Sequence, residues 1–233
     1  MKRSVYLALD FPDWTETDSF LHRNDLRGVP VKVGMELFYK EGVHVIQRLK
    51  EDGHPVFLDL KLHDIPTTVA NAMHNLANLG VNMVTVHTLG GSEMIRNAKA
   101  AFNQGAQPGA KLIAVTILTS MDNQMLHLEL HMAGNVKEEA VHLAQVAKNS
   151  GADGVVCAVN EAAAIKQACS NDFLTVTPGI RLDRLHNNDQ KRVATPSEAI
   201  RNGADILVIG RSVTKASDPK KAYENVLEEM ANA

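Results

Sequence analysis

The sequence is poor in the residue types on which several classes of protein depend. It has only two cysteines, Cys157 and Cys169, in 233 residues, which is too few for a disulfide framework and typical of a reducing compartment. Aromatic residues make up 4% of the chain, too few for a surface on which nucleic-acid bases stack. There are 24 basic residues against 27 acidic ones, so the basic excess of a duplex-binding protein is missing.

Long hydrophobic runs and the common nucleotide and zinc motifs are also missing. The first apolar run, Val5–Leu9, is too short for a signal-peptide core or a membrane span, so we expect a cytoplasmic protein without a membrane partner. The chain contains no Gly-x-x-x-x-Gly-Lys-Ser/Thr loop, which argues against a nucleotide triphosphatase. His127 and His131 are four residues apart, but no third ligand follows them, so we expect both to face solvent.

What the chain has instead is a regular alternation of two kinds of segment. Short runs of apolar, often β-branched residues are mostly continuous, as in strands covered on both faces. Segments with helical spacing lie between them, among them Glu36–Asp52, Thr67–Leu79 and Val136–Ser150, and each ends at a glycine or begins beside a proline or a capping residue. The expected strands are Val5–Leu9, Val29–Val33, Val56–Leu60, Met83–Val86, Leu112–Val115, Gly154–Val159, Phe173–Thr177 and Ile206–Gly210.

Eight strand-and-helix units predict a single (β/α)8 TIM barrel over residues 1–233. No linker, low-complexity segment or shift in composition divides the chain. The alternative is a doubly wound open sheet, which usually has fewer strands and a glycine-rich turn after the first one. Here Asp10-Phe-Pro-Asp13 follows the first strand, which favours the barrel.

Charged residues occur where such a barrel would have its active site, at the carboxyl ends of the strands. Asp10 ends the first strand, Lys32 lies between two valines in the second, and Asp59 and Lys61 close the third. Asp59 and Lys61 are two residues apart and share a face, while the neighbouring leucines face the helices. Because a buried lone charge is costly, we expect these charges to pair at the opening of the barrel. The alternative is a charge network that only fills the barrel.

Two further segments contain candidate binding residues. The loops after the seventh and eighth strands, the usual phosphate site of this fold, contain Pro178-Gly-Ile-Arg181 and Ile209-Gly210-Arg211. Glycine allows backbone N–H groups to approach an anion, and arginine offers a planar fork to phosphate oxygens. Alternatively, Arg211 is a surface arginine. Asp64 and Thr67 flank Pro66, and their simplest role is to cap the helix that follows.

The stretch Asp59-Leu-Lys61-Leu-His-Asp64-Ile-Pro-Thr-Thr resembles the signature of the orotidine 5'-phosphate decarboxylase family in its bacterial form. Metal-dependent sugar-phosphate decarboxylases of the same superfamily share Asp-x-Lys-x-x-Asp but have an acidic residue on the second strand. Lys32 at that position favours the metal-free enzyme, and the metal-dependent decarboxylase is the alternative. The likeness extends to Leu7-Ala-Leu-Asp10, Val31-Lys32-Val-Gly-Met-Glu-Leu-Phe, Ala114-Val-Thr-Ile-Leu-Thr119-Ser120, Thr177-Pro-Gly-Ile-Arg181 and Val208-Ile-Gly210-Arg211-Ser.

The resemblance implies a homodimer that converts orotidine 5'-phosphate to UMP and carbon dioxide in de novo pyrimidine biosynthesis, with no metal, cofactor or nucleic-acid partner. Lys61 would protonate C6, Asp59 would lie beside the departing carboxylate, and Lys32 would bridge the charges and contact the ribose. Asp64 would reach into the neighbouring subunit's site. The other implied substrate-binding residues are Asp10 and Thr68 at the ribose, Thr119 and Ser120 at the pyrimidine, Gln190, Gly210 and Arg211 at the phosphate, and Arg181 near a closing loop.

Overall fold

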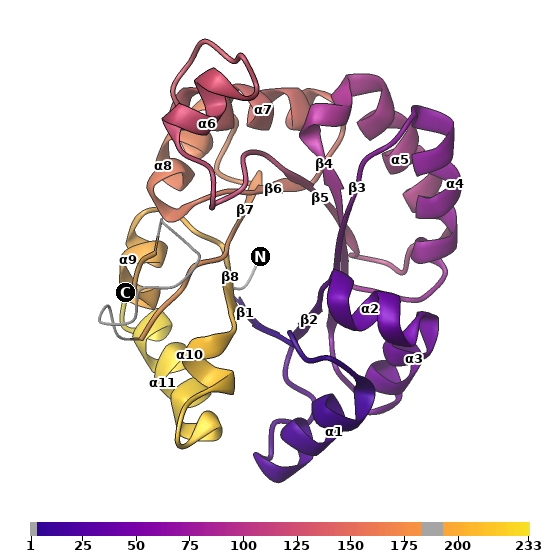
Figure 1. Cartoon of the computed structure of the whole chain (residues 1–233), viewed down its shortest axis with the longest axis vertical. Helices are drawn as coiled ribbons and strands as arrows, with labels where there is room; N and C mark the ends of the chain where they lie inside the picture. The colour runs from indigo at the N-terminus through magenta and orange to yellow at the C-terminus, as the bar shows by residue number, and fades with distance from the viewer. Residues whose placement is uncertain (1–3, 183–192) are drawn as a thin grey trace.

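Eight parallel strands close into a barrel in the order of the sequence, and helices surround it (Figure 1). The structure, a computed structural model, describes residues 4–182 and 193–233. The predicted TIM barrel is therefore confirmed. The strands are β1 Ser4–Ala8, β2 Val31–Val33, β3 Val56–Leu62, β4 Met83–His87, β5 Lys111–Val115, β6 Gly154–Val156, β7 Leu174–Thr177 and β8 Ile206–Ile209.

The helices follow the expected order, with one clear exception. The single helix expected over Glu36–Asp52 is wrong, because Gly42, with φ 65° and ψ −151°, separates two helices. Only glycine adopts that backbone conformation readily, and it interrupts the helical hydrogen bonds. The helices are α1 Trp14–Arg23, α2 Met35–Glu41, α3 Val43–Glu51, α4 Pro66–Ala77, the 3-10 turn η1 Thr88–Gly90, α5 Gly91–Gly105, α6 Asn123–Leu128, α7 Val136–Asn149, α8 Val159–Ala168, α9 Pro196–Arg201, α10 Arg211–Thr214 and α11 Pro219–Ala231.

The helices α7 and α11 have side-chain caps at their starts, whereas the cap expected for α4 is missing. Asn135 accepts a hydrogen bond from the backbone N–H of Glu138 at the start of α7, and Asp218 accepts one from Lys221 at the start of α11. Asp64 does not cap α4: Ile65 occupies the position before the helix, and no side chain makes the capping bond. The alternative of a purely capping role for Asp64 is thus wrong.

The apolar side chains divide between the inside of the barrel and the layer beneath the helices. The inner set is small, and Tyr6 and Phe57 meet in it edge to face with ring centroids 5.8 Å apart. Both faces of each strand are covered, which explains the continuous apolar runs in the sequence. The inner set comprises Tyr6, Ala8, Phe57, Met83, Ile113, Leu174, Val176, Ile206 and Val208.

Polar side chains join neighbouring strands at the amino end of the barrel. Asn82, Asp153 and Asp205 each come directly before an even-numbered strand, in the pattern glycine, any residue, Asp or Asn. Each accepts a hydrogen bond, of 2.8 to 2.9 Å, from a backbone N–H near the start of the preceding strand. The two carboxylates also pair with lysines, Lys99 at 2.6 Å and Lys166 at 2.5 Å. These groups therefore fasten β3 to β4, β5 to β6 and β7 to β8.

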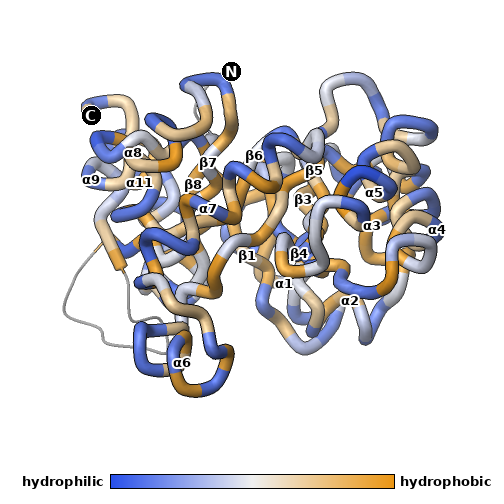
Figure 2. Tube along the Cα trace, turned by 90° about the horizontal axis from the view of Figure 1, so that it is seen from above, coloured by the Kyte–Doolittle hydropathy of each residue, from blue (hydrophilic) through white to orange (hydrophobic). Residues whose placement is uncertain are grey.

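The side view separates the two ends of the barrel. Figure 2 shows the N- and C-terminal ends of the trace on one side and α6, which follows β5, on the opposite side. Because β1 begins near the N-terminus, the amino ends of the strands lie on the first side and their carboxyl ends face α6. No helix in the described parts of the chain is long and apolar enough to cross a membrane.

Candidate active site

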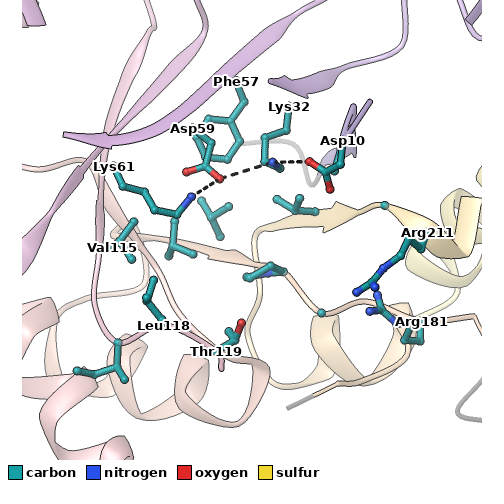
Figure 3. Close-up of a pocket in the computed structure, with 18 residues that line it drawn as sticks. Asp10, Lys32, Phe57, Asp59, Lys61, Val115, Leu118, Thr119, Arg181 and Arg211 are labelled. Atoms are coloured by element: carbon teal, nitrogen blue, oxygen red, sulfur yellow. Dashed lines mark hydrogen bonds and ion pairs between the residues drawn. The ribbon is translucent and has the colours of Figure 1, made fainter. Parts of the chain in front are cut away.

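A pocket of about 250 Å³ opens at the carboxyl ends of the strands. Its wall combines charged groups with apolar side chains such as Val115, Leu118 and Val156. In Figure 3 a row of acidic and basic side chains lies along one side of the pocket, and two arginines lie together elsewhere on its wall. The pocket therefore offers separate surfaces to a charged reacting group and to an anion.

The charged row alternates in sign: Lys32 lies on β2, Asp59 and Lys61 lie on β3, and Asp10 follows the end of β1. The Lys32 ammonium lies 3.4 Å from an Asp10 oxygen and 3.7 Å from Asp59 Oδ2, and Lys61 Nζ lies 3.0 Å from the same Asp59 oxygen. The side chains of Lys32 and Asp59 are each only 12% exposed, whereas Asp10 is 61% exposed. Every buried charge in the row thus has an opposite charge beside it, as its desolvation requires.

The pKa of the Asp59 carboxyl lies below its usual range, as the outcome of opposing effects. Burial raises this pKa, but the charges of Lys32 and Lys61 and hydrogen bonds from Lys61 and Thr85 lower it by more. Asp59 is therefore a carboxylate at neutral pH and holds both ammonium groups on its Oδ2 side.

The backbone at Lys61 is unusual for a strand residue. Its φ is 53°, in the left-handed region, and the pairing of β3 with β4 shifts register between Leu58 and Leu62. The Lys61 N–H leaves the ladder and donates to Thr85 Oγ1 at 2.8 Å, and that hydroxyl donates to Asp59 Oδ1 at 3.1 Å. Backbone in this region costs a lysine free energy and is found where function requires a particular side-chain direction.

A pair of histidines stands beside this network. The rings of His63 and His87 are stacked with centroids 5.5 Å apart. Burial, together with the positive charges of His63 and Lys61, lowers the pKa of His87 to about 4. In keeping with a neutral ring, His87 Nδ1 accepts a hydrogen bond of 3.3 Å from the Leu89 N–H. His87 therefore adds no positive charge at neutral pH.

The arginine side of the pocket is formed by the segments after β7 and β8. Arg181 is 5% exposed, and one of its guanidinium nitrogens donates to the Ile180 carbonyl at 2.9 Å. Arg211 opens α10, and its guanidinium lies next to that of Arg181 in Figure 3. A Cβ at Gly210 would stand 3.5 Å from Ala8 and 3.7 Å from Asp10, so the backbone here approaches the pocket closely. Two adjacent guanidinium groups suit a phosphate.

The sequence model of the orotidine 5'-phosphate decarboxylase / HUMPS family matches residues 3–226. The chain belongs to this family. Orotidine 5'-phosphate decarboxylases from Bacillus cereus and Bacillus mycoides are each 48% identical to it over 232 residues, which cover 98% of this chain and 98% of theirs. The crystal structure of orotidine 5'-phosphate decarboxylase from Lactobacillus acidophilus is similar, with a TM-score of 0.88 and 44% identity over the whole of both chains.

Most of the residues expected for the orotidine 5'-phosphate decarboxylase family lie together, and a few lie elsewhere. Asp64, Thr68 and Ser120 are exposed and do not line the pocket. Asp64 turns one oxygen to the neighbouring Ile65 N–H at 2.7 Å. Gln190 lies outside the described residues. The expected residues that do line the pocket are Asp10, Lys32, Asp59, Lys61, Thr119, Arg181, Gly210 and Arg211.

Sequence reasoning gave no role to two polar residues of β4: Thr85, which contacts Lys61 and Asp59, and His87, whose pKa the charge of Lys61 lowers. His87 directly follows the expected strand Met83–Val86. Thr85 is a single hydroxyl within the apolar run Met83–Val86, and the available signal was its parity: it shares a face with Met83, which points into the barrel. Among the described residues, no group of three or more His, Cys, Asp or Glu is arranged to hold a metal ion.

Proposed function

We propose that this protein decarboxylates orotidine 5'-phosphate to UMP and carbon dioxide in pyrimidine biosynthesis, acting in the cytoplasm without a metal or organic cofactor. The observation that carries the proposal is the row of Asp10, Lys32, Asp59 and Lys61 in the same pocket as a pair of arginines. A nucleotide has an anionic phosphate remote from its base, and this pocket presents two separate charged surfaces. The names of the relatives point the same way.

The proposed reaction needs a cation and a proton at one carbon. The bond between C6 and the carboxylate breaks, its electron pair stays on C6, and carbon dioxide leaves. Lys61 Nζ then gives a proton to C6, forming the C–H bond, and afterwards regains a proton from solvent. The Lys61 ammonium stabilises the developing negative charge, and Asp59, itself paired with Lys32, holds that ammonium in place, so little reorganisation is needed during the reaction.

The remaining residues bind the parts of the nucleotide that do not react. Lys32 and Asp10 would contact the ribose hydroxyls together with Thr68, while Thr119 and Ser120 would meet the pyrimidine. Arg181, Gly210, Arg211 and Gln190 would bind the phosphate. Binding energy from this remote group supports closure around the substrate and hence the organisation of the transition state.

We propose that the active enzyme is a homodimer in which Asp64 completes the partner's site. Asp64 is exposed and outside its own pocket. Large apolar side chains are exposed on the segments after β2, β3 and β4, including Tyr39 at 71%, Ile65 at 68% and Met35 at 46%. An isologous dimer that buried these side chains would bring each Asp64 to the other subunit and form two shared sites.

The reaction is tested by following the loss of absorbance of orotidine 5'-phosphate with the purified protein, with and without EDTA. Turnover that EDTA leaves unchanged is expected. Turnover that EDTA abolishes and a divalent cation restores would instead favour the metal-dependent decarboxylase. Tight binding of UMP with no turnover would indicate a phosphonucleotide-binding protein without activity.

Sharing of the site is tested by mixing two inactive variants, Lys61→Ala and Asp64→Ala, under conditions that allow subunit exchange. A mixed dimer has one site with both defects and one intact site. Random reassortment makes about half the dimers mixed, so activity should return to ~25% of the wild-type value. The matched control mixes Lys61→Ala with Lys32→Ala, which lie in the same pocket and should not complement. No recovery in the first mixture, with exchange confirmed by mass spectrometry, would mean that Asp64 acts within its own subunit.

A further inference from the structure

The buried hydroxyl of Thr85 connects the two residues on which the proposed chemistry depends. Its oxygen lies 2.8 Å from the backbone nitrogen of Lys61 and 3.1 Å from Asp59 Oδ1. Thr85 is on β4, whereas Lys61 and Asp59 are on β3, so the contacts cross the place where the two strands lose their regular pairing. The hydroxyl thus substitutes for the backbone partner that the Lys61 N–H lacks there.

The direction of both hydrogen bonds follows from the groups involved. The Lys61 N–H can only donate, and the ionised Asp59 carboxylate can only accept. The single Thr85 proton must therefore point to Asp59, while a lone pair of the same oxygen receives the Lys61 N–H. Thr85 is 0% exposed, so its hydroxyl is out of contact with solvent water that could make the same hydrogen bonds.

These two bonds determine where the reacting groups point. With Oδ1 held by Thr85, Asp59 is oriented so that Oδ2 lies 3.0 Å from Lys61 Nζ and 3.7 Å from Lys32 Nζ. The other bond satisfies the Lys61 N–H while the residue keeps its φ of 53°. In a regular strand that N–H would find a backbone carbonyl, and the lysine side chain would leave the strand in a different direction.

We propose that Thr85 is a positioning residue for the decarboxylation, and that its hydroxyl sets both the backbone conformation of Lys61 and the orientation of Asp59. The inference rests on the proposed roles of Lys61 and Asp59 and deepens them. It predicts that the chemical step depends on one oxygen atom that does not touch the substrate.

The test compares Thr85→Val with Thr85→Ser. Valine keeps the shape and the β-branched character of threonine, whereas serine keeps the hydroxyl. Because small displacements of reacting groups cost up to about 100-fold in rate, kcat should fall by about 10- to 100-fold in Thr85→Val, with KM within about threefold of wild type. Thr85→Ser should recover kcat to within about threefold of wild type.

A pH profile separates positioning from a merely structural role. The Thr85 hydrogen bond is one of the contacts that lower the pKa of Asp59. Without it this pKa rises, so the acidic limb of the kcat profile should move to higher pH in Thr85→Val and not in Thr85→Ser. Thr175→Val is the matched control: Thr175 is also buried in a strand, but its hydroxyl bonds the Gly203 carbonyl at 2.7 Å and Asp205 at 3.1 Å. It should change stability and leave kcat and its pH profile unchanged.

Two results would overturn the inference. One is a folded Thr85→Val enzyme with wild-type kcat; the other is a Thr85→Ser enzyme as slow as Thr85→Val. If Thr85→Val does not fold, Thr85→Ser is compared with Thr85→Ala, which differs from it by a single oxygen, and equal kcat values in that pair would likewise overturn it. Lys61→Ala, assayed in parallel, tests the underlying function: if it is inactive while Thr85→Val is fully active, only the role of Thr85 is rejected.

Discussion

Both ends of the barrel contain lysine–aspartate pairs, but the other groups that donate hydrogen bonds to the carboxylates differ. At the amino end, Asp153 accepts from Lys99 at 2.6 Å and from the backbone N–H of Leu112 at 2.8 Å. At the carboxyl end, the partners of Asp59 within residues 4–182 and 193–233 are all side chains, the ammonium groups of Lys32 and Lys61 and the hydroxyl of Thr85. At the amino end the carboxylate therefore bonds the backbone of a strand, whereas at the carboxyl end the charged groups face a pocket.

The difference shows how the same residue types serve stability at one end and chemistry at the other. A backbone N–H belongs to the sheet, so a carboxylate that accepts it joins two strands directly. The carboxylate of Asp59 accepts no backbone N–H among the described residues, and the left-handed backbone at Lys61 costs about 1–3 kcal/mol of folding free energy. Contacts elsewhere, including the amino-end pairs, must offset this cost. Substitutions at the two ends should therefore affect different measurements.

The largest effect is expected from Lys61→Ala, set against Lys99→Ala at the other end. Lys61→Ala removes the proposed proton donor and the cation at C6, so kcat should fall by at least about 10²–10⁴-fold with little change in Tm. Lys99→Ala should leave kcat within about twofold and lower Tm, because it removes a bond to Asp153 and a contact over the Phe102 ring. More than about a tenth of wild-type activity in Lys61→Ala would contradict its role.

The next effect concerns recognition rather than chemistry. Arg211→Ala should lower kcat/KM for orotidine 5'-phosphate by about 10- to 100-fold, since a charge-assisted hydrogen bond contributes roughly 1.5–3 kcal/mol. The phosphate-free nucleoside orotidine should be affected little. The control is Arg201→Ala, an exposed arginine at the end of α9, which should alter neither substrate. An equal defect on nucleotide and nucleoside would show that Arg211 does not bind the phosphate.

A smaller effect, confined to stability, is expected at the amino end. Asp205 accepts hydrogen bonds from the Lys166 ammonium and from the Thr175 N–H. At the corresponding position before β4, the side-chain amide oxygen of Asn82 accepts a hydrogen bond from the Val56 N–H. Asp205→Asn should therefore keep the backbone bond and lose the ion pair, and Asp205→Ala should lose both. We expect Ala to lower the free energy of unfolding by about 1–3 kcal/mol and Asn by less, with kcat unchanged in both. Equal losses of unfolding free energy in the two variants, measured with denaturant, would show that the backbone bond adds no stability. A fall in kcat would show that the amino end is not confined to a role in stability.

The smallest effect is a pH dependence at the carboxyl end. The pKa of His87 falls from 6.5 to about 4 on folding. Between these values the unfolded chain binds more protons, so stability should decrease as pH falls from about 6.5 to about 4 and change no further below that. Since the ring is partly exposed, we expect about 1–2 kcal/mol. His87→Gln should flatten this dependence in unfolding measured at pH 7 and 4.5, whereas His22→Gln, on an exposed part of α1, should not. An unchanged slope in His87→Gln would assign the effect to other groups.

The strands and the charged row were predictable because their signals are local. Apolar runs mark strands that are covered on both faces, and Lys32 between two valines must point into the barrel if the valines pack beneath the helices. The same parity predicted a shared face for Asp59 and Lys61, and both line the pocket, although the left-handed backbone at Lys61 departs from regular strand geometry. The division of the expected helix at Gly42 was missed because the helical spacing of apolar residues continues across it. A positive φ does not alter the pattern of hydrophobic residues.

The sequence by itself determined the alternation of strands and helices, from which the barrel was predicted, and the charged residues at the strand ends, because these features follow from periods of two and 3.6 residues along the chain. Only the tertiary structure decided how the charges are held. The bonds from Lys61 and to Asp59 join residues 24 and 26 positions from Thr85, and they exist because β3 and β4 lie side by side with a shifted register. Barrel closure, rather than any local pattern, likewise brings Arg181 and Arg211 into the same pocket as Lys61.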